Sequence, residues 1–177
     1  MDNIKRIMRV DGQTGEVYYS KEEYQTPAFD EEKGYLFWAR KKAAKTFADV
    51  TFPQGMNDLE IGRMVRLSKR IWGKTNMLGY RGNGGVRPYN IDQIGEVIGL
   101  KSRQTHAFVT KMLKLGILAR VVVECEGVKE TQFYVSPIYF FSGNRIPLNL
   151  YLIFREQLDA ILPEWVKQRF DEQGKKK

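Results

Sequence analysis

The chain has 177 residues, of which 42% are hydrophobic, so it is long enough to bury a core as one medium domain or as one domain with appendages. Its formal net charge of +8 favours a polyanionic partner such as nucleic acid or an anionic membrane surface, and nucleic acid is preferred. No apolar run approaches the ~20 residues that span a bilayer. The N-terminus lacks the apolar core of a signal peptide, and the only cysteine is Cys125, which excludes an intramolecular disulfide; we therefore expect a reducing, cytoplasmic location.

Two strand-like segments open the chain, Ile4 to Val10 and Glu16 to Ser20, and the two glycines between them predict a hairpin. The cations of its first strand either contact phosphate or protect an exposed strand edge, and the second interpretation is at least as good. Residues 21–33 are polar and acidic with one proline, which predicts a linker or a loosely packed loop. The segment Tyr35 to Trp38 is apolar enough for a buried strand, and it precedes a basic run of Arg40, Lys41, Lys42 and Lys45.

Asn57 or Asp58 can cap a helix that runs to about Trp72. Its predicted apolar face consists of Ile61, Met64, Val65, Ser68 and Trp72. The cations outside this face are Arg63, Arg66, Lys69 and Arg70. They are slightly better interpreted as solvated charge than as DNA contacts. The stretch Gly73 to Pro88 holds five glycines and a proline, which predicts a long loop, functional or mobile, that matches no P-loop because no Gly-Lys-Ser/Thr follows.

A pair of short helices is predicted next. Apolar residues of the first recur at three- and four-residue steps from Ile91 to Ile98, with Asn90 as N-cap and Gly99 as the glycine that ends it. Ser102 is the expected N-cap of the second helix, which Gly116 ends. Its buried stripe is predicted to be Phe108, Val109, Met112, Leu113 and Leu115.

A two-stranded ribbon is predicted directly after the second helix, with strands at Ile117 to Glu124 and Thr131 to Val135 and a turn at Glu126-Gly127. Two helices joined by a tight turn and followed by a ribbon are expected of a winged helix-turn-helix, in which the second helix enters the DNA major groove. The alternative is a small helical subdomain with a solvated outer face.

The outer face of the second helix carries a mixed set of side chains suited to reading bases. Arg103 can reach guanine O6 and N7, Gln104 can reach adenine N6 and N7, and Thr110 or Ala107 can lie against a thymine methyl group. Lysines further along the helix are better placed for phosphate. The predicted DNA-binding residues are Ser102, Arg103, Gln104, Thr105, His106, Thr110, Lys111, Lys114, Lys129 and Arg145.

The C-terminal part is apolar and helical in pattern. A dense aromatic cluster, Tyr139 to Phe141, is interpreted as core in preference to a base-stacking platform. A helix is predicted over Leu148 to Leu162, and its stripe either completes the core or forms a homodimer seam. The stripe consists of Leu150, Ile153, Phe154, Leu158 and either Ile161 or Leu162. A short terminal helix containing Trp165, Val166 and Phe170 follows, and then a basic tail from Gly174 to Lys177 that is predicted to be disordered.

Two segments carry a family resemblance. They are the Ser-Arg-Gln-Thr helix start at 102–105 and the run from Phe133 through Ser136-Pro137 and the aromatic residues to Arg145. Together they resemble the winged-helix replication proteins of Firmicute plasmids and phages (RepL-like). The likeness covers roughly Leu59 to Arg145, and the hairpin around Asp11, Thr14 and Gly15 also resembles theirs. Ser136 stands where those proteins usually have Asn. The resemblance implies DNA binding at an origin or an operator.

No catalytic residue, metal or cofactor is predicted, so we expect no enzyme. The single histidine, His106, excludes a nuclease built on a pair of metal-binding histidines, and Cys125 has no histidine base at a recognisable spacing.

The sequence thus predicts an α+β protein: a winged helix-turn-helix DNA-binding domain over 53–145, an N-terminal β-hairpin and basic extension over 1–52, and C-terminal helices with a basic tail over 146–177. The expected function is sequence-specific binding of double-stranded DNA as a plasmid- or phage-type replication initiator, with host replication proteins as partners, a possible homodimer through Leu148–Leu162 and no membrane partner. Two alternatives stay open, namely a transcriptional regulator (repressor) of the same fold and a protein-interaction module with non-specific DNA affinity.

Overall fold

The computed structural model describes residues 4–24, 29–30, 34–35, 44–125 and 127–175. Its internal contacts divide the chain into two units, 1–41 and 42–177. The expected basic run at 40–42 and the expected strand residues 36–38 lie outside the described residues, and Tyr35, the first residue of the expected strand, belongs to the strand Gly34–Tyr35.

In the first unit, β1 (Ile4–Val10) and β2 (Val17–Tyr24) form the predicted antiparallel hairpin. The prediction of a linker from residue 21 was wrong at its start, because β2 continues to Tyr24. The register pairs Glu22 with Arg6 and Glu23 with Lys5 along the ladder, so the start of the acidic stretch that suggested a linker is strand. A second, minimal pair joins β3 (Phe29–Asp30) to β4 (Gly34–Tyr35).

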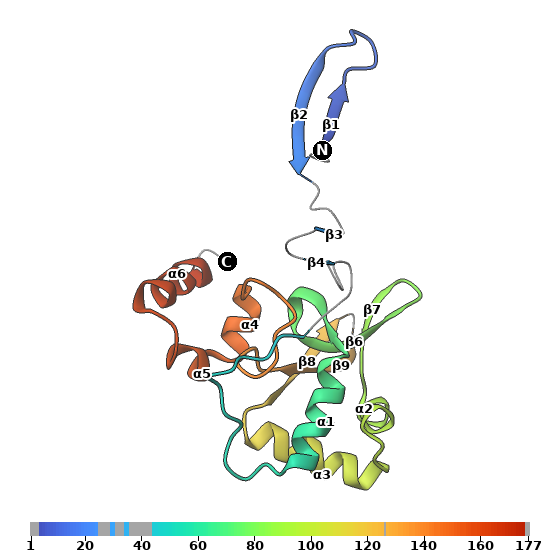
Figure 1. The fold of residues 1–177 in the computed structure, drawn as a ribbon. Coiled ribbons are helices and arrows are strands. Elements are labelled where there is room, and N and C mark those ends of the chain that lie inside the picture. Colours follow the sequence, from blue (N-terminus) through green and yellow to red (C-terminus); the bar gives the residue numbers. More distant parts are fainter. Residues whose placement is uncertain (1–3, 25–28, 31–33, 36–43, 126, 176–177) are drawn as a thin grey trace. The chain divides into compact units, whose positions relative to one another are not determined.

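The second unit is a sheet with helices on both faces (Figure 1). The antiparallel strands follow the order β5-β6-β9-β8, and β7 pairs with β6. In chain order its elements are α1 (Asp58–Ser68), β5 (Ile71–Trp72), the 3₁₀ turn η1 (Gly73–Thr75), β6 (Met77–Gly82), β7 (Gly85–Pro88), α2 (Ile91–Ile98), α3 (Ser102–Lys114), β8 (Leu118–Cys125), β9 (Val128–Val135), α4 (Leu148–Ile153), α5 (Arg155–Asp159) and α6 (Glu164–Lys175).

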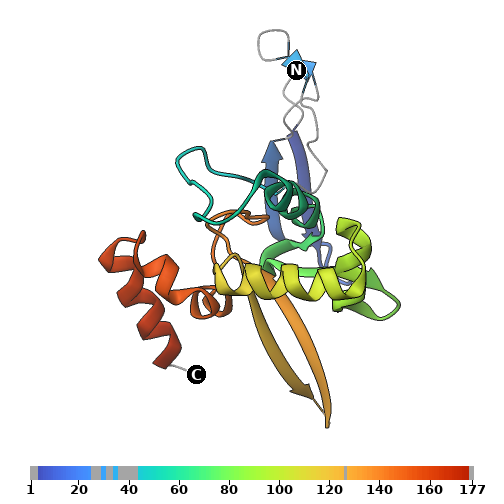
Figure 2. The same ribbon diagram turned by 90° about the horizontal axis from the view of Figure 1, so that it is seen from below.

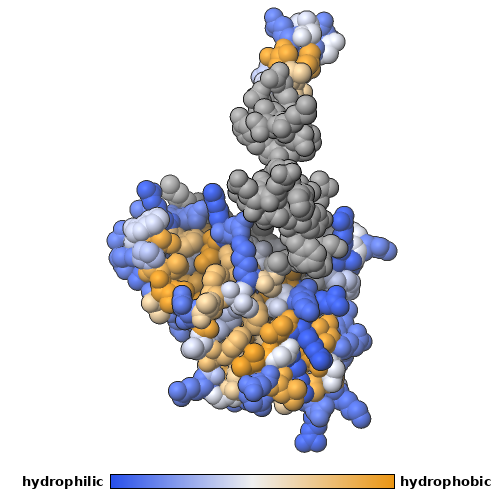
Figure 3. Space-filling view, in the orientation of Figure 1, coloured by the Kyte–Doolittle hydropathy of each residue, from blue (hydrophilic) through white to orange (hydrophobic). Residues whose placement is uncertain are grey.

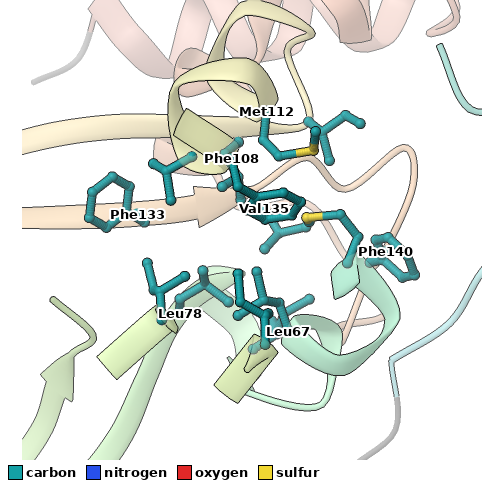
Figure 4. Packing of buried hydrophobic residues seen from close by; sticks show 14 residues of the cluster. Leu67, Leu78, Phe108, Met112, Phe133, Val135 and Phe140 are labelled. Atoms are coloured by element: carbon teal, nitrogen blue, oxygen red, sulfur yellow. The ribbon is translucent and has the colours of Figure 1, made fainter. Parts of the chain in front are cut away.

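Two hydrophobic cores lie on opposite faces of this sheet. Because side chains alternate along a strand, Leu118, Phe133 and Val135 face α1, α2 and α3, where they join the first core (Figure 4). Ala119 and Tyr134 belong to the second core, with residues of α4, α5 and α6. Both faces of the inner part of the sheet are therefore buried, which holds the helices of each layer in place.

The predicted helix at 57–72 is correct at its start and wrong at its end. Asn57 caps α1 with a capping box, in which the Glu60 N–H donates to the Asn57 side chain at 2.9 Å and the Asn57 N–H donates to the Glu60 carboxylate at 3.0 Å. The helix ends at Ser68, because Ile71–Trp72 pairs with β6. The buried face of α1 differs from the predicted one, since Val65 is 42% exposed and Leu67 is fully buried. Figure 3 shows apolar residues at the surface along α1.

The prediction of a loop at 73–88 was wrong, because most of this stretch is strand. Met77 and Leu78 are buried, and β6 pairs with β5, β7 and β9. One glycine of this stretch is required by packing rather than by a turn, since a Cβ on Gly79 would lie 2.8 Å from the Arg87 carbonyl oxygen. Glycine content predicted a loop here, whereas β5 and β7, which adjoin β6 in the chain, and the more distant β9 supply its hydrogen-bond partners.

A buried asparagine connects this stretch to the region after β9. Asn76 is fully buried with φ 58°, and its side-chain amide donates to the carbonyl oxygens of Val135 at 2.9 Å and of Phe140 at 2.7 Å. Its side-chain oxygen accepts from the Ser142 N–H at 3.2 Å. Asn tolerates the left-handed backbone better than most residues, and here both ends of its amide are also satisfied.

The C-terminal segment differs from the single helix predicted over Leu148 to Leu162. It forms α4 and α5, separated at Phe154, where φ is −117° and ψ is 28°. Leu150, Phe154 and Leu158 are buried in the second core, so this part of the stripe packs within the chain. A homodimer stays a prediction, and its interface would have to be formed by other residues. The aromatic cluster is core as predicted, with Phe140 and Phe141 buried.

The last helix, α6, packs against α4 through aromatic stacking. The Phe170 ring lies 4.1 Å from the Tyr151 ring at an interplanar angle of 11°. Gly174 and Lys175, which were expected in a disordered tail, are the last residues of α6. Among the helices of the described residues, none combines the length and the apolar character needed to cross a bilayer.

Candidate nucleic-acid interface

The two predicted helices meet at a three-residue turn formed by Gly99, Leu100 and Lys101. Asn90 caps α2 as predicted, with a second capping box to Gln93 at 2.8 and 3.0 Å. Gly99 has φ +70°, and the Leu100 N–H donates to the Gly95 carbonyl at 2.9 Å, which ends the helix and reverses the chain. The predicted start, end and buried face of α2 are confirmed, with Ile94 and Ile98 buried.

Thr105 is fully buried in this turn, so its predicted role as a DNA-binding residue was wrong. Its hydroxyl donates to the carbonyl oxygens of Lys101 at 3.1 Å and Leu100 at 3.3 Å. A Cβ on Gly95 would lie 2.6 Å from the Thr105 hydroxyl, so the two helices approach as closely as glycine allows. Lys101, rather than the expected Ser102, is the N-cap residue of α3, and no side chain caps this helix.

One face of α3 is free of the core and points away from it. Arg103, Ala107, Thr110 and Lys114 recur every three or four residues and are all exposed. The opposite face carries Phe108, Val109 and Met112, which are buried. Ser102, Gln104 and His106 are also exposed on either side of the outward line. The predicted division of α3 into a buried and a polar face is confirmed.

Lys111 is half exposed and is engaged with another helix. Its ammonium lies 2.7 and 2.8 Å from the two carboxylate oxygens of Glu60 on α1. This hydrogen-bonded cation lowers the pKa of Glu60 below its ordinary value of 4.5, against the opposing effect of burial. Lys111 therefore fixes α3 to α1 and is less available to a phosphate than Lys114.

The ribbon formed by β8 and β9 follows α3 as predicted and projects past it, with its outer half clear of other elements (Figure 2). Lys129 is exposed, and its ammonium lies 3.7 Å from the carboxylate of Glu124, its partner across the ladder. Glu130 is exposed as well. The ribbon is therefore nearly balanced in charge, whereas α3 carries Arg103, Lys111 and Lys114 and no acidic residue.

Arg145 is exposed but is not brought together with α3. It lies in the segment between β9 and α4 and lines a hollow of about 660 Å³ together with Gln173 of α6. The described lining of this hollow consists of residues 142–148 and Gln173, and it includes no residue of α3. Arg145 and the residues of α3 thus belong to different surfaces.

Sequence reasoning missed two cations at the α2–α3 turn. Lys101 is exposed immediately before α3, and its place directly before the helix start could have identified it. Arg66 of α1, which was interpreted as solvated charge, comes close to this turn, because its Nη1 would lie 4.0 Å from a Cβ on Gly99. Only the tertiary packing of α1 on α2 reveals this approach. Together with Arg103, they give the start of α3 a concentrated positive charge.

Nothing in the geometry of the described residues forms a metal centre, since no group of three His, Cys, Asp or Glu side chains there could hold an ion. Comparison with protein-family models, with curated proteins and with solved structures finds no match to this chain.

Proposed function

We propose that this protein binds double-stranded DNA sequence-specifically, with α1, α2, α3 and the β8–β9 ribbon acting as a winged helix-turn-helix. The observation that carries the proposal is the outward line of Arg103, Ala107, Thr110 and Lys114 on a helix whose opposite face is buried. A major groove accepts one helix, and a base-reading set near its start followed by a phosphate-binding lysine suits that position. The proposal includes a cytoplasmic location.

The positive charge at the start of α3 supports the same orientation. Lys101, Arg103 and the nearby Arg66 would approach the phosphates at the groove edge, where each neutralised phosphate releases counterions. The ribbon contributes little to this attraction, because Lys129 lies beside Glu124. Affinity is therefore expected to depend mainly on α3 and on the turn before it.

The specific role that we favour is initiation of plasmid- or phage-type replication, with host replication proteins as partners, and this part rests on the sequence resemblance alone. A repressor would bind DNA in the same way. Loss of replication from a minimal replicon on deletion of the gene is the result expected of an initiator. Replication that continues without the gene would contradict initiation and favour a regulator.

Selection of bound sequences from a random duplex pool tests DNA binding directly. We expect the selected site to bind ~10³-fold or more tightly than random duplex. Arg103→Ala should cost about 1–3 kcal/mol and relax the preference at one base pair, whereas Lys114→Ala should weaken all sequences alike. Arg169→Ala on α6 removes one exposed cation far along the chain and serves as the control, with unchanged affinity.

Two outcomes would contradict this proposal. Equal affinity for selected and random duplexes, lost steeply with salt, would leave only non-specific attraction and favour the interaction module. Equal effects of Arg103→Ala and Lys114→Ala on every sequence would exclude direct readout by α3.

A further inference from the structure

The outer half of β8 is an open strand edge. β8 is the last strand in the sheet order, and in the described part of the chain nothing pairs with it on the side away from β9. Val122 is 56% exposed and Val123 is 38% exposed. A long apolar edge without proline is a ready template for another strand, and proteins usually protect such an edge.

The backbone groups at this edge can be assigned from the ladder. The Ser136 N–H donates to the Ile117 carbonyl at 2.8 Å, so the odd-numbered positions of β8 direct their backbone groups toward β9. Because strands alternate, Arg120, Val122 and Glu124 direct their N–H and C=O groups to the open edge. Three successive donor and acceptor pairs are therefore free to meet a second strand.

The sequence of β8 is symmetric in character about Val122. Valines flank it at positions 121 and 123, and charges of opposite sign follow at Arg120 and Glu124. If two copies of this strand pair antiparallel about Val122, each valine meets a valine. Arg120 then lies opposite Glu124 of the second copy, and the same pair forms twice because of the two-fold axis.

We propose that the open edge of β8 binds the same edge of a second copy of this chain, antiparallel and centred on Val122. The ribbons would join into a four-stranded sheet. Charges on an edge strand ordinarily discourage pairing, but these two are complementary under the two-fold operation, so they select this partner and this register. Within the sheet, Glu124 would lie between Lys129 of its own chain and Arg120 of the second copy.

A hollow at the base of β8 leaves room for the end of the second ribbon. In this register the end of the partner's β8, at Cys125, lies opposite Ala119. A hollow of about 460 Å³ lies there, lined by Gly116, Leu118, Ala119 and residues 152–157. It includes Leu152, which is 52% exposed, and Val128 near the end of the ribbon is 69% exposed. Apolar side chains are thus available on both sides of this second contact.

The proposed dimer does not depend on DNA binding. It replaces the seam expected over Leu148–Leu162, whose stripe is buried in the second core. If the proposed DNA binding also holds, the two-fold axis relates two copies of α3, and a target of two inverted half-sites follows.

The test uses the full chain without DNA and measures its association by sedimentation velocity. The wild type should be dimeric, and Arg120→Glu or Glu124→Arg should each raise the dissociation constant about 10- to 100-fold, since two attractive pairs become two repulsive ones. Both side chains are exposed, so circular dichroism should report an unchanged fold. Arg169→Glu, a reversal at an exposed position of α6, is the control for net charge and should leave the protein dimeric.

Two restorations make the test specific. The double variant Arg120→Glu with Glu124→Arg exchanges the charges and should recover the dimer. An equimolar mixture of the two single variants should form a heterodimer, because every facing pair then has opposite charges. A monomeric wild type, single variants that stay dimeric, or a mixture that stays monomeric would each overturn the proposal, and none of these results bears on DNA binding.

Discussion

Replacing Gly95 with alanine should destabilise the protein, although alanine is the better helix former. A Cβ at this position would lie 2.6 Å from the Thr105 hydroxyl oxygen and 2.9 Å from the Leu100 carbonyl oxygen, and the second atom belongs to the backbone of the α2–α3 turn. Overpacking typically costs about 1–3 kcal/mol, and two contacts shorter than 3.0 Å, one of them to backbone, place this case at about 2–3 kcal/mol. The gain in helix propensity offsets about 1 kcal/mol of that cost. We expect a net loss of about 1–2 kcal/mol in the free energy of unfolding.

The matched control is the same substitution in α1. Gly62 is exposed inside that helix, and a Cβ there would meet nothing within 4 Å. Gly62→Ala should therefore stabilise the protein by about 0.5–1 kcal/mol, because only the helix propensity changes. Urea unfolding followed by circular dichroism measures both variants, with equal slopes as the condition for comparing them.

The opposite signs of the two effects are the critical result. If Gly95→Ala proved as stable as the wild type, the close approach of α2 and α3 would not be what requires glycine. Removing the Thr105 side chain from the Gly95→Ala variant should recover only part of the loss, since the Leu100 carbonyl still lies in the way. Full recovery would assign the whole cost to the hydroxyl.

Three further predictions concern stability. Asn76→Ala should lower the free energy of unfolding by about 3–5 kcal/mol in chemical unfolding, because two buried carbonyls lose their donor and alanine disfavours positive φ. The control Asn83→Ala changes an exposed asparagine and should alter it by no more than about 0.5 kcal/mol, so similar losses in both variants would refute the role of the buried amide. Glu60→Gln should flatten the pH dependence of stability in acid. The pKa of the Glu60 carboxylate is lowered from its ordinary value of 4.5, so this group stabilises the fold at pH values above 4.5 and loses that contribution as the pH falls through the lowered pKa. An unchanged pH profile in the variant would contradict this reasoning. Phe170→Ala should release α6 before the main unfolding transition, seen as an early loss of amide protection from hydrogen exchange in that helix, and simultaneous opening of all helices would oppose it.

Local signals predicted the helices around the turn well. Asn90, Gly99 and Gly116 act through the backbone of their own neighbours, so their capping roles can be read from the sequence. The division of α3 into two faces follows from periodicity alone. The error at Thr105 arose because a polar residue near a helix start can satisfy its hydroxyl within the turn, and only the packing of Gly95 against it shows this.

Strand pairing and contacts that are distant in sequence explain the other errors. The stretch 73–88 has the glycine content of a loop, yet β6 is held by strands that lie before and after it in the chain. Asn76 reads as a turn residue, but its partners Val135 and Phe140 are about sixty positions away. The break at Phe154 likewise lacks a proline or glycine, and the backbone there turns between α4 and α5 at a residue buried in the second core.

The sheet connects the two surfaces proposed for this protein. Its inner part is covered on both faces, so α3 rests on a layer that the C-terminal helices also hold in place. Its outer part is covered on neither face, and there Val122 and Val123 are exposed although burying them would stabilise the fold. The strands thus continue beyond what the monomer core needs. In the proposed dimer these valines would be buried against their copies, and the opposite charges at Arg120 and Glu124 would set the register of that contact.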